Sequence, residues 1–491
     1  MAKAGDAAPF SEAPKLGVPT KLAYGFGSVA FGVKDNGFRT FLFLFYNQVV
    51  GLPAGMVSMA ILVAMVFDAF LDPVIGYWSD NLHSKWGRRH PFMYAAAAPA
   101  ALSYLLLWNP PMDWSQNALM GWLIAVAVLS RTCITLFEIP SSSLAAELTT
   151  DYDQRTSIMS YRVFFAWWGG LALTVLAYKV LLQPTAHYPV GQLNRDGYAT
   201  YGLIAAATMF GAIILSALGT HNRIPWLRKP PPPRKLTLWA GVREVFQVLS
   251  NKPFIVMALV ALFAAAAEGA GFVMSLYFMT YFWGLSGDQS GTLVAAAFIG
   301  SLVAAFAAPF ISKRQGKKGA AMILLVIATL LTSAPLLLRL AGMFPPNGSP
   351  LLLPILFANS VIVGTVGITC AILITAMIAD VAEDSQLQTG RRNEGVIFAA
   401  MSFIGKAVSG VGAVIVGVIL VLVHFPAKAD PAHMDPLILR NLAMAYLVML
   451  FTLYGISLML LSFYRITRAS HQDTLNRLAE IKAAETAASI F

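Results

Sequence analysis

Runs of roughly 20 or more residues without a charged side chain recur along the chain and decide which solvent it folds in. A helix needs about 20 predominantly apolar residues to cross the hydrocarbon core of a bilayer. Runs of that size occupy 40–67, 91–112, 197–220, 289–312, 340–379 and 441–464. Because 57% of the residues are hydrophobic and only 12% are charged, a globule in water could not cover this apolar surface. The composition therefore excludes a soluble enzyme, a disordered protein and a fibrous repeat.

Shorter apolar stretches that contain single charges raise the expected number of spanning helices to twelve. Hydropathy places them near 22–48, 55–80, 91–109, 117–140, 157–183, 199–219, 253–283, 290–311, 319–340, 350–380, 394–424 and 438–465. The N-terminal segment before them is polar and lacks the apolar core of a cleavable signal peptide. The sequence thus predicts an all-α membrane protein that crosses the bilayer many times.

The basic residues set the expected orientation, because lysine and arginine concentrate in cytoplasmic loops. With both termini in the cytoplasm, 24 Lys and Arg residues lie on the cytoplasmic side, and five lie in or beside external loops. This asymmetry predicts an integral membrane protein with both termini in the cytoplasm. It also accounts for the net charge of +10, so no nucleic-acid partner is needed to explain that charge.

A basic segment divides the chain near its middle. Pro230 to Pro233 cannot continue a helix, and the flanking lysines and arginines keep this segment in the cytoplasm. We therefore expect an N-terminal six-helix bundle over 1–220, a cytoplasmic linker over 221–252, a C-terminal six-helix bundle over 253–466 and a cytoplasmic tail over 467–491.

A faint repeat relates the two halves. The segment GYWSDNLHSKWGRRHPF follows the second expected span and PFISKRQGKKGAAM follows the eighth. Each places a glycine, Gly87 or Gly316, before paired cations. The alternative is that any cytoplasmic loop is basic, but the matched position in two six-span halves is typical of the major facilitator fold.

Ten ionisable side chains fall inside the expected spans, where each costs roughly 2.5–3.5 kcal/mol on insertion scales. A membrane protein with a purely structural role would have little reason to keep so many. The ten residues are Lys34, Asp35, Arg39, Asp68, Asp72, Arg131, Glu138, Arg162, Glu268 and Lys406.

Asp68 and Asp72 lie four residues apart on one span, so their carboxylates share a helix face about one turn apart. Such a pair needs a positive group between them, which a bound cation, a proton or a lysine can supply. Hard monovalent cations prefer oxygen ligands, which favours a cation site. The alternative is a structural pair that Lys406 alone neutralises.

The other charges within the spans suggest contacts to a polar substrate. Asp35 and Arg39 have the favourable i,i+4 order of an ion pair, which could instead only hold the helix in place. A carboxylate accepts hydrogen bonds from hydroxyls, and a guanidinium forks onto carboxylate or phosphate. The candidate substrate-binding residues are Asp35, Arg39, Arg131, Glu138, Arg162 and Glu268.

A further group of charges lies at the expected cytoplasmic ends of the spans. As solvated loops they would carry no function, but the matched order in the two halves favours gating salt bridges that stabilise one closed state. The candidate gating residues are Asp80, Gly87, Arg88, Arg89, Glu147, Arg155, Asp380, Glu383 and Arg391.

Several segments in order resemble the glycoside–pentoside–hexuronide:cation symporters of the major facilitator superfamily, the family of the melibiose permeases. They are KLAYGFGSVAFGVKD (21–35), FDAFLDPVIGYWSDNLHSKWGRRHPF (67–92), FEIPSSSLAAELTTDYDQRT (137–156), YRVFF (161–165), MIADVAEDSQ (377–386) and FIGKAVSG (403–410). The resemblance covers almost the whole chain. It implies twelve transmembrane helices in two six-helix bundles around a central cavity.

The resemblance also implies roles for individual residues. Asp68 and Asp72 match the acids that bind the coupling sodium, with Thr135 as an assisting ligand and Lys406 as their charge partner. Leu71 replaces an asparagine of that site, which leaves proton coupling open. The family's sugar-binding aspartate of the first span matches Asp35, and its sugar-binding aspartate of the fourth span is replaced by Glu138, which is one methylene longer. The family's arginine of the fifth span matches Arg162.

Two departures bear on the substrate. Ser142 and Ala371 replace tryptophans that border sugar in melibiose permeases, so galactoside recognition is not implied. Glu268 lies in EGAGFVMSLYFMTY, which is similar to the seventh span of the sodium-dependent lysophosphatidylcholine symporters, a branch of the same family. We therefore expect symport of a small glycoside, sugar or sugar acid with Na⁺ or H⁺ by alternating access, and a lysophospholipid or another amphiphile is the alternative.

The remaining features fit a transporter. The sequence shows no metal-ligand cluster and no nucleophile beside a base with its orienting group, which argues against an enzyme. Cys133 and Cys370 lie far apart in apolar stretches and are expected to be core thiols. No cofactor is expected beyond the coupling ion. The expected partners are a small-molecule substrate and the lipid bilayer, with a monomer as the expected state.

Overall fold

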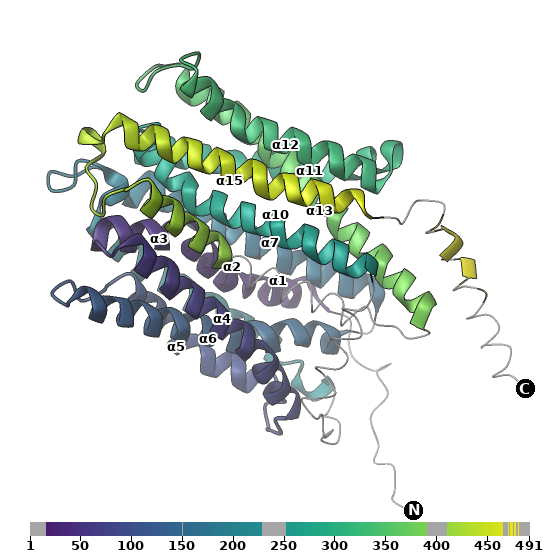
Figure 1. Cartoon of the computed structure of the whole chain (residues 1–491). Coiled ribbons are helices and arrows are strands. Elements are labelled where there is room, and N and C mark those ends of the chain that lie inside the picture. The colour runs from purple at the N-terminus through teal and green to yellow at the C-terminus, as the bar shows by residue number, and fades with distance from the viewer. Residues whose placement is uncertain are drawn as a thin grey trace, which may run out of the picture. The chain divides into compact units, whose positions relative to one another are not determined.

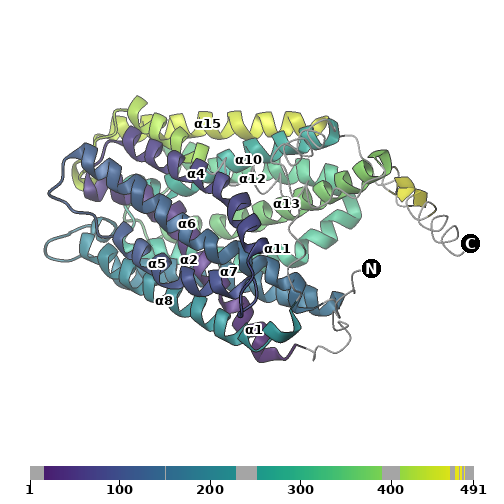
Figure 2. The same cartoon turned by 90° about the horizontal axis from the view of Figure 1, so that it is seen from below.

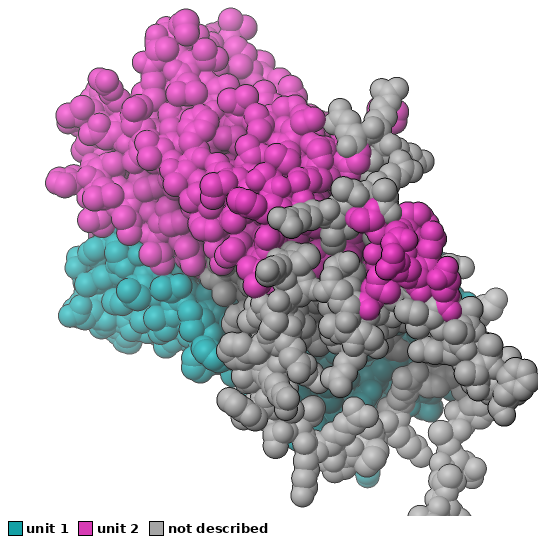
Figure 3. Space-filling model, turned by 45° about the vertical axis from the view of Figure 1, so that its right-hand side comes forward, with its two compact units in different colours: residues 1–234 teal, residues 235–491 magenta. Residues whose placement is uncertain are grey.

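The computed structural model describes residues 16–149, 151–227, 252–389 and 410–464, together with residues 470, 472–474, 476–477 and 480. Contacts between Cα atoms divide the chain into two compact units, residues 1–234 and residues 235–491 (Figure 3). The division falls inside the basic proline-rich segment 221–252. Across the described residues, helices joined by turns make up both units (Figure 1).

The first unit contains α1 (Val18–Phe26), α2 (Ser28–Asn36), η2 (Gly37–Phe41), α3 (Leu42–Leu44), η3 (Phe45–Val50), α4 (Ala54–Asn81), α5 (His90–Leu107), α6 (Gln116–Leu148), α7 (Tyr152–Leu176), η4 (Ala177–Leu181), η5 (Gly191–Leu193), α8 (Arg195–His221) and η6 (Ile224–Trp226). The second unit contains α10 (Lys252–Tyr277), η7 (Phe278–Phe282), α11 (Gly287–Gln315), α12 (Lys317–Leu340), α13 (Leu352–Thr389), a helix over Gly410–Leu422, η8 (Pro431–His433) and α15 (Pro436–Ser462).

Eight of the described helical segments are long and apolar enough to cross a membrane. The spans expected at 22–48, 91–109 and 290–311 are helical as well. Residues 394–409 of the expected span 394–424 lie outside the described residues, so the count of twelve and the cytoplasmic termini stay predictions. Large apolar side chains point outward from these helices, with Phe70 69% and Phe306 80% exposed, as expected where lipid is the solvent.

The two halves share turn geometry at two places. Gly51 follows the π-helical η3 and Gly284 comes two residues after the π-helical η7, both with positive φ, at 95° and 60°. Gly87 and Gly316, which precede the paired cations, also have positive φ, at 71° and 74°. Positive φ favours glycine because it has no Cβ. The faint repeat in the sequence therefore corresponds to matched backbone turns.

Each unit has its own packed interior. In the first, α5 packs against both α6 and α8, and Trp108 stacks on Tyr198 with ring centroids 5.8 Å apart. In the second, α10, α12, α13 and α15 run alongside one another around residues such as Met377 and Leu461 (Figures 1 and 2). The two cysteines are free thiols buried in these interiors, Cys133 in the first unit and Cys370 in the second.

A close contact between α2 and α7 positions the charged end of α2. A Cβ added at Gly32 would lie 1.8 Å from the carbonyl oxygen of Ala166, and one added at Gly170 would lie 2.4 Å from that of Gly32. Only glycine allows the two backbones to approach this closely. Lys34 and Asp35 follow Gly32 by two and three residues, so this contact fixes the backbone that carries them near α7.

Candidate functional site

A polar stripe on α6 organises the candidate site in the first unit. Ser115 caps the start of α6 by accepting a hydrogen bond from the amide of Ala118. Arg131, Thr135 and Glu138 follow at i, i+4 and i+7, so they share one helix face over about 10 Å of rise. This stripe faces charged residues of α4 and α7.

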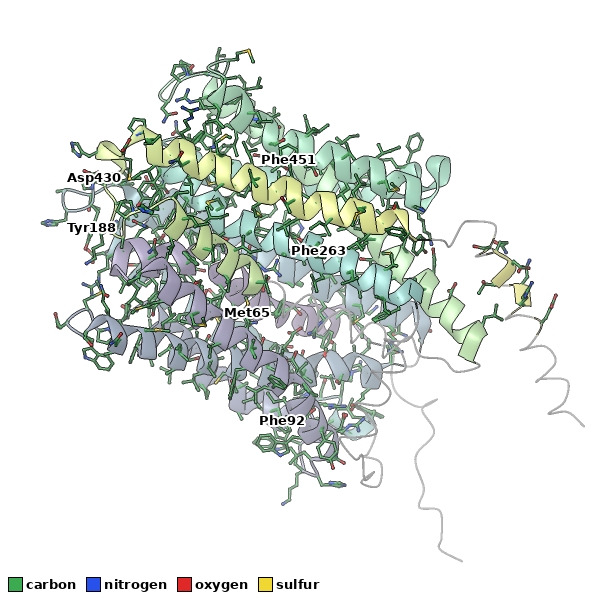
Figure 4. All side chains as sticks on the ribbon, viewed as in Figure 1. Met65, Phe92, Tyr188, Phe263, Asp430 and Phe451 are labelled. Atoms are coloured by element: carbon green, nitrogen blue, oxygen red, sulfur yellow. The ribbon has the colours of Figure 1, made fainter. Side chains whose placement is uncertain are left out.

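Asp68 of α4 meets the first part of this stripe. Met65, labelled in Figure 4, lies about one turn before it on the same helix. Arg131 Nη2 donates to Asp68 Oδ2 at 2.6 Å, and Thr135 Oγ1 donates to Asp68 Oδ1 at 2.9 Å. Asp68 is 3% exposed and Arg131 is 5% exposed. The structure thus places Thr135 beside Asp68, as the sequence suggested.

Arg131, a candidate substrate-binding residue, forms an ion pair with Asp68, an acid of the expected cation site. Its contact with a substrate stays a prediction. Asp72, one turn further along α4, is partly buried. Lys406, the expected charge partner of the two acids, lies outside the described residues.

The charges at the end of α2 form the next part of the site. Arg39 Nε lies 2.9 Å from Asp35 Oδ2, and Lys34 Nζ lies 3.9 Å from Asp35 Oδ1. The Arg131 guanidinium carbon lies 5.5 Å from the centre of the Phe38 ring, a cation–π contact. The α2–η2 segment therefore lies next to Arg131 and brings Asp35 into its electrostatic range.

Glu138 and Arg162 form the last part of the site. Arg162 Nη2 donates to Glu138 Oε1, and its Nη1 donates to Ser141 Oγ at 3.1 Å and to Tyr24 Oη at 3.3 Å. Tyr24 in turn donates to the carbonyl oxygen of Ser141 at 2.8 Å. The ion pair joins two of the candidate substrate-binding residues.

Sequence reasoning missed Tyr24 and Ser141. Both are buried and hold the Arg162 guanidinium in place. A tyrosine in an apolar span is usually a packing residue, so neither residue type nor spacing singled them out.

Two buried polar atoms of the stripe have no hydrogen-bond partner within the part of the chain that the structure describes. They are the Nε–H of Arg131, a donor, and Oε2 of Glu138, an acceptor. A buried polar group without a partner is costly, so each of these atoms is suited to bind a polar ligand. Together they offer one donor and one acceptor along the same face of α6.

A second charged cluster lies where α4, α5 and α6 end or begin. Glu147 Oε1 lies 2.8 Å from Arg88 Nη2 and 2.9 Å from Arg89 Nε, and Arg89 Nη2 lies 2.5 Å from Asp80 Oδ1. Arg155 is exposed at the start of α7. Glu147 therefore ties α6 to the turn after α4, and Gly87 gives that turn its positive φ.

The second unit repeats part of this arrangement. Lys317 Nζ donates to both oxygens of Asp380, at 2.6 and 2.8 Å, which ties the start of α12 to α13. Glu383 is partly buried one turn further along α13, and Arg391 lies outside the described residues. In both units, therefore, a basic side chain that directly follows a glycine with positive φ forms an ion pair with an acid of a neighbouring helix.

Glu268 lies in the second unit on α10, where it is exposed. Its neighbours Gly269 and Ala270 make the close backbone approach that the surrounding glycines suggested. A Cβ added at Gly412 would lie 2.5 Å from the amide nitrogen of Ala270. The helix over Gly410–Leu422 therefore crosses α10 directly beside Glu268.

Comparison with known proteins identifies relatives along nearly the whole chain. A family model described as MFS/sugar transport protein matches residues 23–468. The uncharacterized symporter sll1374 of Synechocystis sp. is 27% identical over 95% of this chain and 97% of its own length. The isoprimeverose transporter of Lactiplantibacillus pentosus is 23% identical over 91% of this chain and 88% of its own length.

Solved structures give the same fold. The nucleoside transporter NupG superimposes with a TM-score of 0.59 at 12% sequence identity, covering 91% of this chain and 99% of its own. At this identity the similarity shows the fold alone. The all-helical, multi-pass architecture thus agrees with that of solved transporters.

Proposed function

The chain belongs to the MFS/sugar transport protein family, and from this membership we propose that it is a cation-coupled symporter of a small glycoside, sugar or sugar acid. The transported molecule and Na⁺ or H⁺ cross a bacterial inner membrane together. In this proposal the chain forms two six-helix bundles with both termini cytoplasmic, and movement of the bundles about the substrate site gives alternating access.

The observation that carries the proposal is the polar stripe of α6. Arg131, Thr135 and Glu138 lie in an apolar span, and all three bind charged partners on α4 or α7. Charged side chains inside a membrane span are energetically costly, so their presence there indicates a functional role. The unfilled donor at Arg131 and the unfilled acceptor at Glu138 suit a ligand with several hydroxyls or a carboxylate.

Each part of the stripe has a distinct role in this proposal. Asp68, Asp72 and Thr135 supply oxygens to the coupling ion, with Lys406 as the charge partner. The substrate contacts Asp35, Arg39, Arg131, Glu138 and Arg162 in the first unit and Glu268 in the second. Each ligand raises the affinity for the other, which couples the two fluxes. The clusters at Glu147 and at Asp380 stabilise one closed state.

The test is uptake by purified protein in proteoliposomes. An imposed inward Na⁺ gradient, and separately a pH gradient, should accelerate uptake of labelled glycosides and uronides from a panel over uptake without a gradient. Glu138→Gln should abolish the accelerated uptake, whereas Asp196→Asn, at an exposed position in the first turn of α8, should leave it unchanged. Uptake that responds to neither gradient would overturn the proposal.

One observation favours an amphiphile as the alternative substrate. Ser142 replaces a tryptophan that borders sugar in melibiose permeases, and its hydroxyl donates to the carbonyl oxygen of Ile139 of its own helix at 2.8 Å. The same proteoliposomes distinguish the two classes. If uptake saturates with no glycoside of the panel, and lysophosphatidylcholine inhibits it below its micellar concentration, the substrate would be assigned as an amphiphile.

A further inference from the structure

We infer that the guanidinium of Arg131 takes the place of the coupling ion at Asp68 while no ion is bound. When an ion binds at Asp68, the guanidinium moves away from Asp68 and binds the substrate. The inference rests on the proposed symport function and assigns the coupling step to one side chain.

The first support is the competition for the same oxygens. Both carboxylate oxygens of Asp68 are engaged, Oδ2 by Arg131 and Oδ1 by Thr135. A hard cation needs several oxygen ligands and cannot share Oδ2 with a guanidinium at 2.6 Å. Binding of the ion and pairing with Arg131 are therefore mutually exclusive.

The second support is charge balance in a buried place. Asp68 and Arg131 are both nearly inaccessible to solvent, and a buried carboxylate without a counter-charge is strongly unfavourable. Asp72 lies one turn away and adds like-charge repulsion. Arg131 balances the charge of Asp68 while no ion is bound, and an incoming ion at Asp68 replaces one positive charge with another.

The third support is a hydrogen-bond donor of Arg131 that does not bind Asp68. Its buried Nε–H donates to no acceptor among the described residues, although its guanidinium contacts the Phe38 ring. Asp35 of the proposed substrate site lies in electrostatic range. Directed toward this region, the fork can bind a carboxylate or paired hydroxyls of the substrate.

A purely structural salt bridge that holds α4 to α6 is the competing explanation, and it makes a different prediction. Removal of the guanidinium would then lower stability, and no ion would restore it. Under our inference, the same change opens the oxygens of Asp68, Asp72 and Thr135 to any small cation, so stability should return as the cation is added.

The experiment measures the thermal unfolding midpoint of the full-length protein in detergent as NaCl replaces choline chloride at constant ionic strength. For Arg131→Gln, the NaCl concentration that gives half of the maximal stabilisation should fall roughly tenfold or more below that of the wild type. The double variant Asp68→Asn with Arg131→Gln should lose this response. Arg195→Gln, at the exposed start of α8, should match the wild type.

The outcomes separate this inference from the proposed function. Equal NaCl responses in the wild type and Arg131→Gln would overturn the inference even if gradient-driven uptake is intact. Absence of gradient-driven uptake would overturn the symport function, whatever the NaCl response. If Arg131→Gln does not fold, Arg131→Lys replaces the fork with a single ammonium and should give an intermediate gain, and no gain would equally overturn the inference.

Discussion

Replacement of Gly32 by alanine should separate α2 from α7 and destabilise the first unit. A Cβ at this position would lie 1.8 Å from the Ala166 carbonyl oxygen, which belongs to the backbone and cannot rotate away. An ordinary contact requires about 3.5 Å, so the two helices must move apart by more than 1.5 Å. Gly170 lies in the same contact, which leaves no free space on either side.

The magnitude follows from two opposing terms. Overpacking of a tight interior costs about 1–3 kcal/mol, and a clash with backbone belongs at the upper end. Alanine in a helix recovers about 0.5–1 kcal/mol relative to glycine. We therefore expect a net loss of about 2 kcal/mol for Gly32→Ala. Gly211 of α8 has nothing within 4 Å of its added Cβ. Gly211→Ala should therefore raise the free energy of unfolding by only the about 0.5–1 kcal/mol that alanine contributes over glycine in a helix.

Thermal unfolding of purified protein, followed by tryptophan fluorescence, measures the difference. A change of 1 kcal/mol shifts Tm by about 2–4 °C for a unit of 150–250 residues, so Gly32→Ala should melt about 6–12 °C below Gly211→Ala. The same variant should also weaken substrate binding, since Asp35 follows Gly32 by three residues. If the two variants melt within about 2 °C of each other, the α2–α7 contact is not as close as described.

Further predictions concern the charged clusters and the matched turns. Glu147→Gln should cost about 3 kcal/mol of unfolding free energy because it removes the buried carboxylate that Arg88 and Arg89 share and leaves Arg89 with the exposed Asp80 as its acidic partner. Lys317→Gln should cost less than about 1 kcal/mol, since that side chain is 35% exposed. Chemical denaturation of the two variants compares these costs, and equal losses would refute the argument from burial. Tyr24→Phe removes a buried hydroxyl that binds Ser141 and should cost about 1–2 kcal/mol in the same assay; an unchanged midpoint would contradict this. Gly316→Ala should cost about 1–3 kcal/mol through backbone strain alone, because its φ is 74° and nothing lies near its added Cβ, and a neutral effect would show that the turn relaxes.

Much of the fold follows from the sequence because lipid imposes a simple rule. Long uncharged runs must become helices, so the expected spans over 55–80 and 199–219 correspond to α4 and α8 within a few residues. The paired glycines Gly87 and Gly316 also marked real turns. The matched turns of Gly51 and Gly284 went unnoticed, since the π-helices before them leave no pattern in hydropathy.

The candidate site was only partly predictable. Periodicity shows which residues share one helix face, so it placed Asp68 and Asp72 together. It does not show which other helix that face meets, so it could not pair Arg131 with Asp68 or Glu147 with Arg88. Those pairings depend on how the helices pack, and close packing at Gly32 and similar positions sets that arrangement. The functional roles of these residues stay predictions.

The two buried thiols have a practical consequence for measuring the transport cycle. Thiolate is the reactive form of cysteine, and burial in apolar surroundings disfavours it, so Cys133 and Cys370 should react slowly with maleimides. A single cysteine introduced at an exposed position would then carry a spectroscopic label against a nearly silent background. Distance changes between two such labels, one in each unit, could be followed in the otherwise native chain as ion and substrate are added.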